Sequence, residues 1–266
     1  MFSLPLGFIL LILFVFGCCI GSFLCVCSER LPKGQSIIHP GSHCPYCKQS
    51  IPWFLNIPIF GWIFLKGKTA CCKKSIPLRY LLSEIFVGIA AVVFYLNCKS
   101  LFWPHFVLFC FLWIAFWTDF TTMIIPDEVS LLGICIGILL SFFYPQMHGV
   151  YENFLGMVTS LKCTCLGIGG LFLFISFIEF FLKKEAMGLG DVKLIGCIGA
   201  FLGWEGCLFS LFVGSIIGTA YIFIFYLYQR SVNKNHVQLR QKQIPFGPFL
   251  SIATIFYILY GSNALK

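Results

Sequence analysis

The chain has 266 residues, of which 59% are hydrophobic, 18% aromatic and only 11% charged. This composition excludes an ordinary soluble domain and indicates a protein that resides in a lipid bilayer. The formal net charge of +8 could suggest nucleic acid binding, but the Lys and Arg residues gather in a few loops between apolar runs, which is a signal of membrane topology. We therefore expect a lipid-embedded protein with no nucleic acid partner.

The apolar runs predict an all-α polytopic membrane protein, because about 20 apolar residues are enough for a helix to cross the hydrocarbon core. The first run has no basic residue before it and no small-residue cleavage site after it, so we expect a retained anchor rather than a removed signal peptide. The sixth run is barely long enough to cross, so seven spans with a re-entrant or fused segment is the alternative. The sequence predicts about eight transmembrane helices, at approximately 4–27, 80–97, 101–118, 128–144, 159–182, 191–203, 206–229 and 246–262.

The placement of basic residues predicts the orientation. With eight spans, the loops after the first, fifth and seventh spans lie on one face, and by the positive-inside rule this face is cytoplasmic. Both termini then point outward, where only Lys99, Lys162 and Lys266 are found. The basic residues on the cytoplasmic face are Arg30, Lys33, Lys48, Lys66, Lys68, Lys73, Lys74, Arg79, Lys183, Lys184, Lys193, Arg230, Lys234, Arg240 and Lys242.

Three segments follow from this pattern: an anchor helix (1–27), a polar cytoplasmic loop domain (28–79) and a membrane domain (80–266). The loop domain is rich in Pro and Gly and has almost no apolar core, so it needs another source of stability. Metal binding is the usual substitute at this size. No tandem repeat is apparent along the chain.

Four cysteines lie together in the loop domain, and they predict a structural zinc site. Cys44 and Cys47 have the C-x-x-C spacing that holds one side of a tetrahedral zinc ion. Cys71 and Cys72 are adjacent, so two arrangements are open. Either both of them bind, or Cys72 binds and His39 or His43 supplies the fourth ligand. The other eleven cysteines lie in or beside apolar runs and behave as small hydrophobic residues.

The chain has only three aspartates, all at predicted cytoplasmic ends of spans. An ionisable side chain at membrane depth costs on the order of 3 kcal/mol and needs a partner or a function. Asp127 follows Pro126 near the start of a helix, where a carboxylate favours the helix dipole, and we expect a structural role there. Asp119 has no comparable structural role, since it lies at the C-terminal end of its helix, where the helix dipole disfavours a negative charge. Asp191 follows Gly188 and Gly190, which allow close backbone approach to another helix.

Asp119 and Asp191 are therefore the candidate catalytic pair. Two carboxyl groups in hydrogen-bonding range share one proton, so the ionised member can act as a general base on water. The protonated member can then donate to the oxygen of a scissile carbonyl. This chemistry is peptide hydrolysis without a covalent intermediate.

The chain resembles the type IV prepilin peptidases, which combine a prepilin leader peptidase with an N-methyltransferase. The resemblance covers nearly the whole chain. It is carried by five segments in a fixed order, namely Gly21–Leu24 with Glu29–Pro32, the cysteine loop with Lys66–Lys68, Arg79, Tyr80 and Glu84, then Asp119 with Ile125–Asp127, Glu185–Lys193, and Ile244–Pro248.

The resemblance implies a GxGD-type intramembrane aspartic peptidase of the inner cell membrane, with Asp119 and Asp191 catalytic, Asp127 not, and a site facing the cytoplasm. It implies prepilins or type II secretion pseudopilins as substrates, cut before their apolar helix. It also implies methylation of the new N-terminus with S-adenosylmethionine. Thr69 stands where the family has the first cysteine of its second C-x-x-C, which leaves Cys71 off register, and Cys25 replaces a usual Asn.

Two alternatives remain at this stage. The first is a general intramembrane protease of the presenilin or signal-peptide-peptidase type, which would cut within a transmembrane helix. The second is a proton-coupled transporter that uses Asp119 and Asp191 as proton carriers. Transporter sites usually gather at the membrane midplane, whereas these two acids are predicted at one edge.

Overall fold

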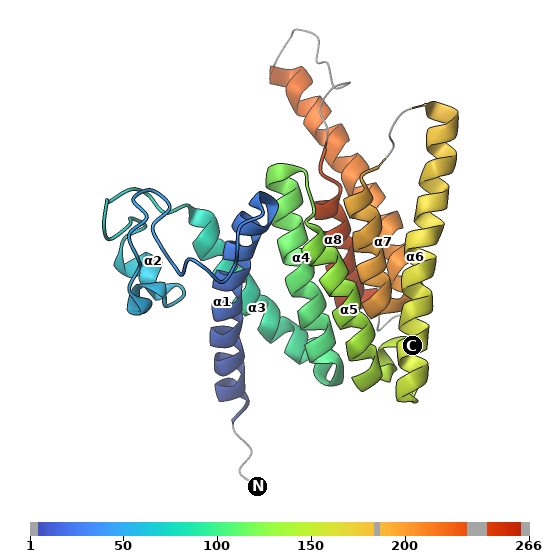
Figure 1. The fold of residues 1–266 in the computed structure, drawn as a ribbon, viewed down its shortest axis with the longest axis horizontal. Coiled ribbons are helices and arrows are strands. Elements are labelled where there is room, and N and C mark those ends of the chain that lie inside the picture. The colour runs from blue at the N-terminus through green and yellow to red at the C-terminus, as the bar shows by residue number, and fades with distance from the viewer. Residues whose placement is uncertain (1–4, 184–186, 233–243, 262–266) are drawn as a thin grey trace. The chain divides into compact units, whose positions relative to one another are not determined.

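The structure is a computed structural model, and it describes residues 5–183, 187–232 and 244–261 (Figure 1). The described regular structure is helical, with only two isolated β-bridges. Of the predicted basic residues, Lys184, Lys234, Arg240, Lys242 and Lys266 lie outside the described residues. The elements are α1 (Leu6–Arg30), η1 (Leu31–Lys33), η2 (Trp53–Asn56), α2 (Phe60–Phe64), α3 (Leu78–Cys98), η3 (Lys99–Leu101), α4 (Phe102–Thr122), α5 (Asp127–Phe143), η4 (Pro145–His148), α6 (Asn153–Leu182), α7 (Leu189–Val232), α8 (Gly247–Phe256) and η6 (Tyr257–Gly261).

The chain divides into two compact units, Met1–Phe102 and Trp103–Lys266. The boundary at Phe102 falls inside the segment 80–266 that the sequence analysis treats as one membrane domain. It leaves α3 in the first unit, where this helix packs on α1.

The expected polytopic, all-helical membrane fold is confirmed. Four helical runs of the described residues are long and apolar enough to cross a membrane. Two of these runs contain a break, the second at η3 and the fourth at Gly203, whose φ of 73° is not helical. The count of eight crossings stays a prediction. The four runs are Leu6–Lys33, Leu78–Thr122, Asn153–Leu182 and Leu189–Tyr228.

The break in α7 reverses the direction of the chain. The Cys207 thiol lies 3.4 Å from the carbonyl oxygen of Ile195, whereas twelve residues of continuous helix would separate them by about 18 Å along the axis. The parts of α7 before and after Gly203 therefore form a helical hairpin. The expected runs 191–203 and 206–229 correspond to its two arms.

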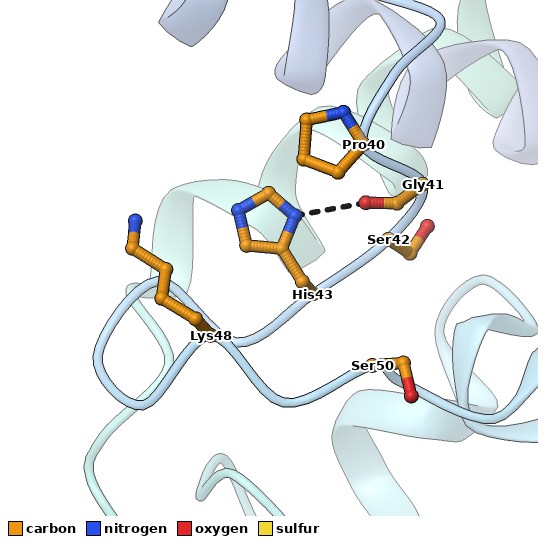
Figure 2. Close-up of a pocket in the computed structure, with 6 residues that line it drawn as sticks. All are labelled: Pro40, Gly41, Ser42, His43, Lys48 and Ser50. Atoms are coloured by element: carbon orange, nitrogen blue, oxygen red, sulfur yellow. Dashed lines mark hydrogen bonds between the residues drawn. The ribbon is translucent and has the colours of Figure 1, made fainter.

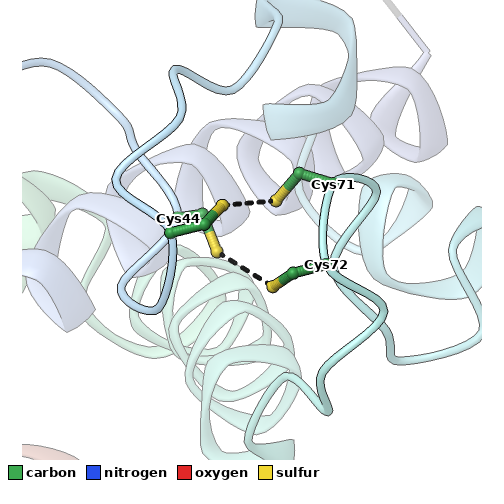
Figure 3. Close-up of side chains that lie close together, drawn as sticks. Cys44, Cys71 and Cys72 are labelled. Atoms are coloured by element: carbon green, nitrogen blue, oxygen red, sulfur yellow. Dashed lines mark hydrogen bonds between the residues drawn. The ribbon is translucent and has the colours of Figure 1, made fainter.

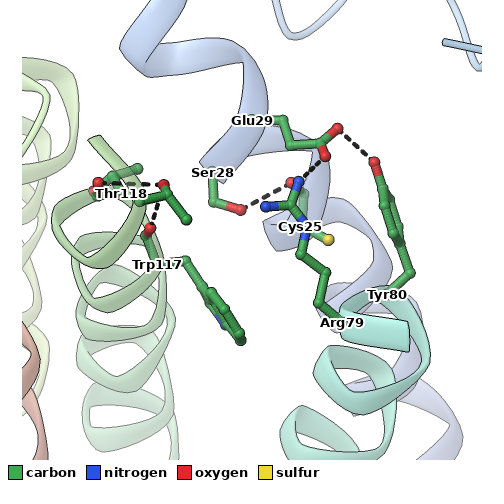
Figure 4. Close-up of polar contacts among 8 residues, drawn as sticks. Cys25, Ser28, Glu29, Arg79, Tyr80, Trp117 and Thr118 are labelled. Carbon is green, nitrogen blue, oxygen red and sulfur yellow. Dashed lines mark hydrogen bonds and ion pairs between the residues drawn. The ribbon is translucent and has the colours of Figure 1, made fainter. Parts of the chain in front are cut away.

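In the first unit, small residues allow α1 and α3 to pack closely. Gly17 and Gly21 have the G-x-x-x-G spacing that brings membrane helices together. A Cβ atom on Gly21 would lie 2.8 Å from the carbonyl oxygen of Ser83, and one on Gly17 would lie 2.7 Å from that of Val87. At the ends of these helices, Glu29 forms an ion pair with Arg79 and accepts a hydrogen bond from the Tyr80 hydroxyl (Figure 4).

The loop between α1 and α3 contains an internal repeat that the sequence analysis missed. Segments 42–51 and 67–76 form two turns with the same backbone hydrogen bonds, each closed by one β-bridge. Both turns contain a Lys with positive φ, Lys48 (61°) and Lys73 (57°). The paired bonds are Cys44 N to Gln49 O (2.9 Å) and Thr69 N to Lys74 O (2.8 Å), then Ile51 N to Ser42 O (2.9 Å) and Ile76 N to Gly67 O (2.7 Å).

We expect Gly21→Val to weaken the packing of α1 on α3. The added side chain meets backbone atoms that cannot move without separating the helices, and overpacking of this kind costs about 1–3 kcal/mol. The thermal unfolding midpoint in detergent micelles measures the effect. Gly7→Val is the matched control in the same helix, because no atom of the described residues lies within 4 Å of a Cβ atom there. Equal midpoints for the two variants would contradict the prediction.

Candidate active site and cysteine centre

Asp119 lies in the last turn of α4 and is only 6% exposed. The backbone N–H of Gly247, at the start of α8, donates a hydrogen bond of 2.8 Å to its Oδ2 atom. A Cβ atom at position 247 would lie 2.8 Å from this oxygen, so only glycine lets the amide approach the carboxyl group without displacement. Segment 244–248, which the sequence analysis noted without a role, thus supplies a hydrogen-bond donor to the first predicted acid.

Asp191 lies in the first turn of α7. The preceding Gly190 packs against the α4–α5 connection, because a Cβ atom there would lie 3.2 Å from the Cβ atom of Ile125. This close approach brings the start of α7 to the end of α4, and the carboxyl groups of Asp191 and Asp119 interact electrostatically. The Oδ1 atom of Asp191 is buried and has no hydrogen-bond partner among the described residues. Glu185 and Ala186, which begin the predicted motif, lie outside the described residues.

Asp127 lies in a different environment from Asp119 and Asp191, because its side chain is exposed to solvent. It is exposed in the first turn of α5, where the sequence analysis expects a carboxylate to favour the helix dipole. It forms an ion pair of 2.6 Å with Lys193. The structure therefore gives Asp127 a partner on the surface. That partner, Lys193, lies two residues after Asp191 in the sequence.

The four loop cysteines form one cluster, in which all four Sγ atoms lie within 4.8 Å of one another. The Sγ atom of Cys44 lies 3.7 Å from that of Cys72 (Figure 3). The Sγ atom of Cys47 lies 3.1 Å from that of Cys71. In a tetrahedral Zn–S₄ centre, Zn–S bonds of about 2.3 Å place the sulfur atoms about 3.8 Å apart. The donor set and its spacing therefore fit a zinc ion, with both Cys71 and Cys72 as ligands.

The thiols of this cluster already differ in acidity. Backbone N–H groups of Cys47 and Tyr46 stabilise the thiolate of Cys44 and lower its pKa to about 6. A hydrogen bond from Thr69 lowers the pKa of Cys72. The hydrogen bond between Cys71 and Cys47 raises the pKa of Cys71 to about 12, because the proton is shared there. Zinc binding would displace this proton, since the thiolate is the ligand.

The two histidines considered as the fourth ligand belong to a neighbouring pocket instead. His43 lines an open pocket of about 240 Å³ together with Lys48, and its Nδ1 atom lies 2.8 Å from the carbonyl oxygen of Gly41 (Figure 2). His39 lines a second pocket beside it. Neither histidine is part of the cysteine cluster, so the arrangement with two adjacent cysteines is the one that the structure supports.

Comparison with known proteins gives matches to two family models. Residues 15–98 match the bacterial peptidase A24 N-terminal domain, and residues 106–223 match the type IV leader peptidase family. A relative in Aeromonas salmonicida is 30% identical, with 96% of this chain and 92% of the relative covered. The chain belongs to the type IV leader peptidase family.

Other relatives within the type IV leader peptidase family agree with this result. One in Pectobacterium carotovorum is 29% identical over 94% of this chain and 92% of the relative. One in Klebsiella pneumoniae is 31% identical over 76% of this chain and 89% of the relative. All three relatives are named prepilin leader peptidase/N-methyltransferase. No solved structure matches the chain.

The two family models correspond to the two compact units, since the gap between the matches, 99–105, contains the unit boundary. The cysteine cluster lies within the residues matched by the N-terminal model, and the aspartate pair lies within those matched by the leader peptidase model.

Two features of this family member were not predicted from the sequence. The first is the contact of Gly247 with Asp119, which joins distant parts of the chain. The second is the repeated turn, which the shared sequence Cys-Lys-x-Ser-Ile-Pro at 47–52 and 72–77 could have revealed.

We expect the purified protein to contain one zinc ion per chain, and Cys71→Ser to lose it as fully as Cys72→Ser does. Each variant removes one of four sulfur ligands, and a site with three ligands holds the ion more weakly. Elemental analysis of the protein in detergent measures the zinc content. His39→Ala and His43→Ala are the matched controls and should retain the metal. Retention by Cys71→Ser together with loss by His43→Ala would restore the alternative ligand set.

Proposed function

We propose that this protein is an aspartic prepilin leader peptidase in which Asp119 and Asp191 are the catalytic residues. The proposal rests mainly on one observation. The contact of Gly190 with Ile125 brings Asp191, at the start of α7, to the end of α4 where Asp119 lies, and Asp119 is buried against a backbone donor. The names of the relatives supply the substrate class, a prepilin with an N-terminal leader. Type II secretion pseudopilins are proposed as substrates from the sequence resemblance alone.

The hydrogen bonds suggest how the two acids divide their roles. A hydrogen bond from a backbone N–H favours the ionised carboxylate, so Asp119 is suited to act as the general base on water. Asp191 has an Oδ1 atom that receives no donor from the described residues, so it is suited to hold the shared proton and donate it to the scissile carbonyl oxygen. Water then adds to the carbonyl carbon, the C–N bond breaks, and the new amine leaves with a proton.

The proposed orientation places this site at the cytoplasmic side of the inner membrane. Lys193 lies beside Asp191, and the cysteine loop is basic, so the positive-inside rule assigns both to the cytoplasm. A substrate would then keep its apolar helix in the bilayer and present its charged leader to the basic face. The cut at the leader boundary distinguishes this enzyme from a general intramembrane protease.

A second activity, N-methylation of the new N-terminus, is proposed from the names of the relatives. S-adenosylmethionine would supply the methyl group to the free amine, which exists only after cleavage. The cysteine cluster would contribute indirectly, with Cys44, Cys47, Cys71 and Cys72 holding a structural zinc ion that keeps the two turns of the loop together. The cation–π contact of Lys74 with the Tyr46 ring, at 4.6 Å, joins the same two turns.

We expect Asp119→Asn and Asp191→Asn each to reduce prepilin cleavage by about 100-fold or more, because each removes one partner of the acid–base pair. Asp127→Asn is the matched control and should process normally, since it removes only a surface ion pair. Co-expression with a candidate prepilin, followed by mass measurement of its N-terminus, gives the result. Loss of the leader reports the peptidase and an added methyl group reports the transferase. Normal processing by either catalytic variant would remove the proposed mechanism.

We expect Gly247→Ala to lower kcat about 10- to 100-fold with little change in KM, because the added methyl group displaces the Asp119 carboxyl group from its productive position. Steady-state cleavage of a prepilin by purified protein measures both constants. Gly170→Ala is the control, because a Cβ atom at that position would have no neighbour within 4 Å in the part of the chain that the structure describes. Equal kcat values for both variants would show that the Gly247 contact does not position Asp119.

A further inference from the structure

The loop between α1 and α3 exposes large apolar side chains in η2 and α2. Trp53 is 79% exposed, Phe60 is 72% exposed and Phe64 is 78% exposed. Phe54 and Ile63 are exposed beside them. An exposed apolar group of this kind in an otherwise polar segment marks an interaction surface.

A hydrogen bond to Glu84 of α3, a residue that also contacts α1, fixes the depth of this segment. The backbone N–H of Ile59, between η2 and α2, donates to the Glu84 carboxylate at 2.7 Å. Ser22 also hydrogen-bonds to Glu84. Ile59 has a φ of 64°, which is a rare conformation for a β-branched residue, so this contact holds the chain in a defined and unusual place.

These contacts lie well inside the two helices, away from the C-terminal end of α1 and the N-terminal end of α3. Glu84 is six residues into α3, about 9 Å along its axis, and Ser22 is eight residues before the end of α1, about 12 Å. The helix ends are level with each other, because Glu29 pairs with Arg79 (Figure 4). Figure 1 accordingly shows α2 alongside the C-terminal half of α1 rather than beyond its end. If Arg30 and Arg79 lie at the membrane surface, α2 lies at the depth of the headgroup and upper acyl region.

The charge of the loop complements an anionic lipid surface. Segment 28–79 carries eight Lys and Arg residues and one acidic residue, Glu29, and that residue is already paired with Arg79. Lys66 and Lys68 follow α2 directly. Aromatic residues next to Lys are the combination that binds membrane interfaces, where the rings enter the acyl boundary and the ammonium groups meet lipid phosphates.

We propose that segment Trp53–Phe64 is an interfacial membrane anchor, whose exposed aromatic side chains insert into a bilayer containing anionic phospholipid on the side where α1 ends. The anchor holds the cysteine centre against the membrane surface, because the loop carrying Cys71 and Cys72 begins directly after α2. The inference does not depend on the proposed catalysis, since it rests on the first unit alone.

Tryptophan quenching in lipid nanodiscs tests this placement in the full chain. Discs of phosphatidylcholine and phosphatidylglycerol are prepared with bromine at a shallow or a deep acyl position. The signal of Trp53 is the difference between wild type and Trp53→Phe. We expect the shallow bromine to quench this signal more strongly than the deep one, and aqueous iodide to quench it weakly. Trp62→Phe gives the matched comparison within the same segment, because the Trp62 ring packs against Gly67 inside the loop and its signal should be quenched less by the shallow bromine than that of Trp53.

Other outcomes would overturn the proposal. Strong quenching by iodide without quenching by bromine would place Trp53 in water. Protection from both quenchers would show that protein, from another part of this chain or from a substrate, covers the surface. Discs without phosphatidylglycerol should weaken the shallow quenching, and identical quenching in the two lipids would contradict the role assigned to the basic residues.

Discussion

The second unit depends on how a buried carboxyl group is accommodated at the end of a membrane helix. Asp119 lies against the apolar interior, where an isolated ionised group costs on the order of 3 kcal/mol or more. The amide of Gly247 offsets part of this cost, and it can do so only if α8 packs against α4. Ser251 extends this packing by donating to the carbonyl of Leu112 at 3.3 Å, and Thr254 donates to Ser210 on α7 at 3.0 Å. The short helix α8 is thereby fixed to α4 and α7, which carry the two proposed catalytic acids.

The hairpin of α7 solves a related problem for the backbone. Because Gly203 is not helical, the Ala200 carbonyl loses its usual intrahelical donor, and an unsatisfied carbonyl inside a membrane bundle is costly. Hydroxyl groups from two other helices replace that donor. Ser160 on α6 donates at 2.7 Å and Ser141 on α5 donates at 3.3 Å, while His148 lies 3.0 Å from Ser141. The turn is therefore held by α5, α6 and η4 together.

The sequence predicted the features that depend on local pattern. Apolar length indicated the helices, and the scarcity of acids at membrane depth singled out Asp119 and Asp191. It predicted two spans that meet near Gly203 but left a fused segment open, because glycine permits both a continuous helix and a turn, and the decision rests on Ser141 and Ser160 in other helices. The role of Gly247 was equally out of reach. A backbone N–H leaves no chemical signature in its own side chain, and its acceptor lies far away in the sequence.

The cysteine centre shows why a motif comparison and the structure disagree about the same residues. An alignment compares positions, and at that level Thr69 occupies the place of a missing ligand. The backbone of the second turn depends on its hydrogen bonds and on the positive φ of Lys73, neither of which requires a cysteine at position 69. Thr69 keeps the turn and hydrogen-bonds to Cys72 at 3.2 Å, while Cys71 brings its thiol to 3.1 Å from Cys47. A metal ion responds to the positions of sulfur atoms rather than to sequence register, so a thiol displaced by two residues within the same turn can complete the proposed set of four ligands.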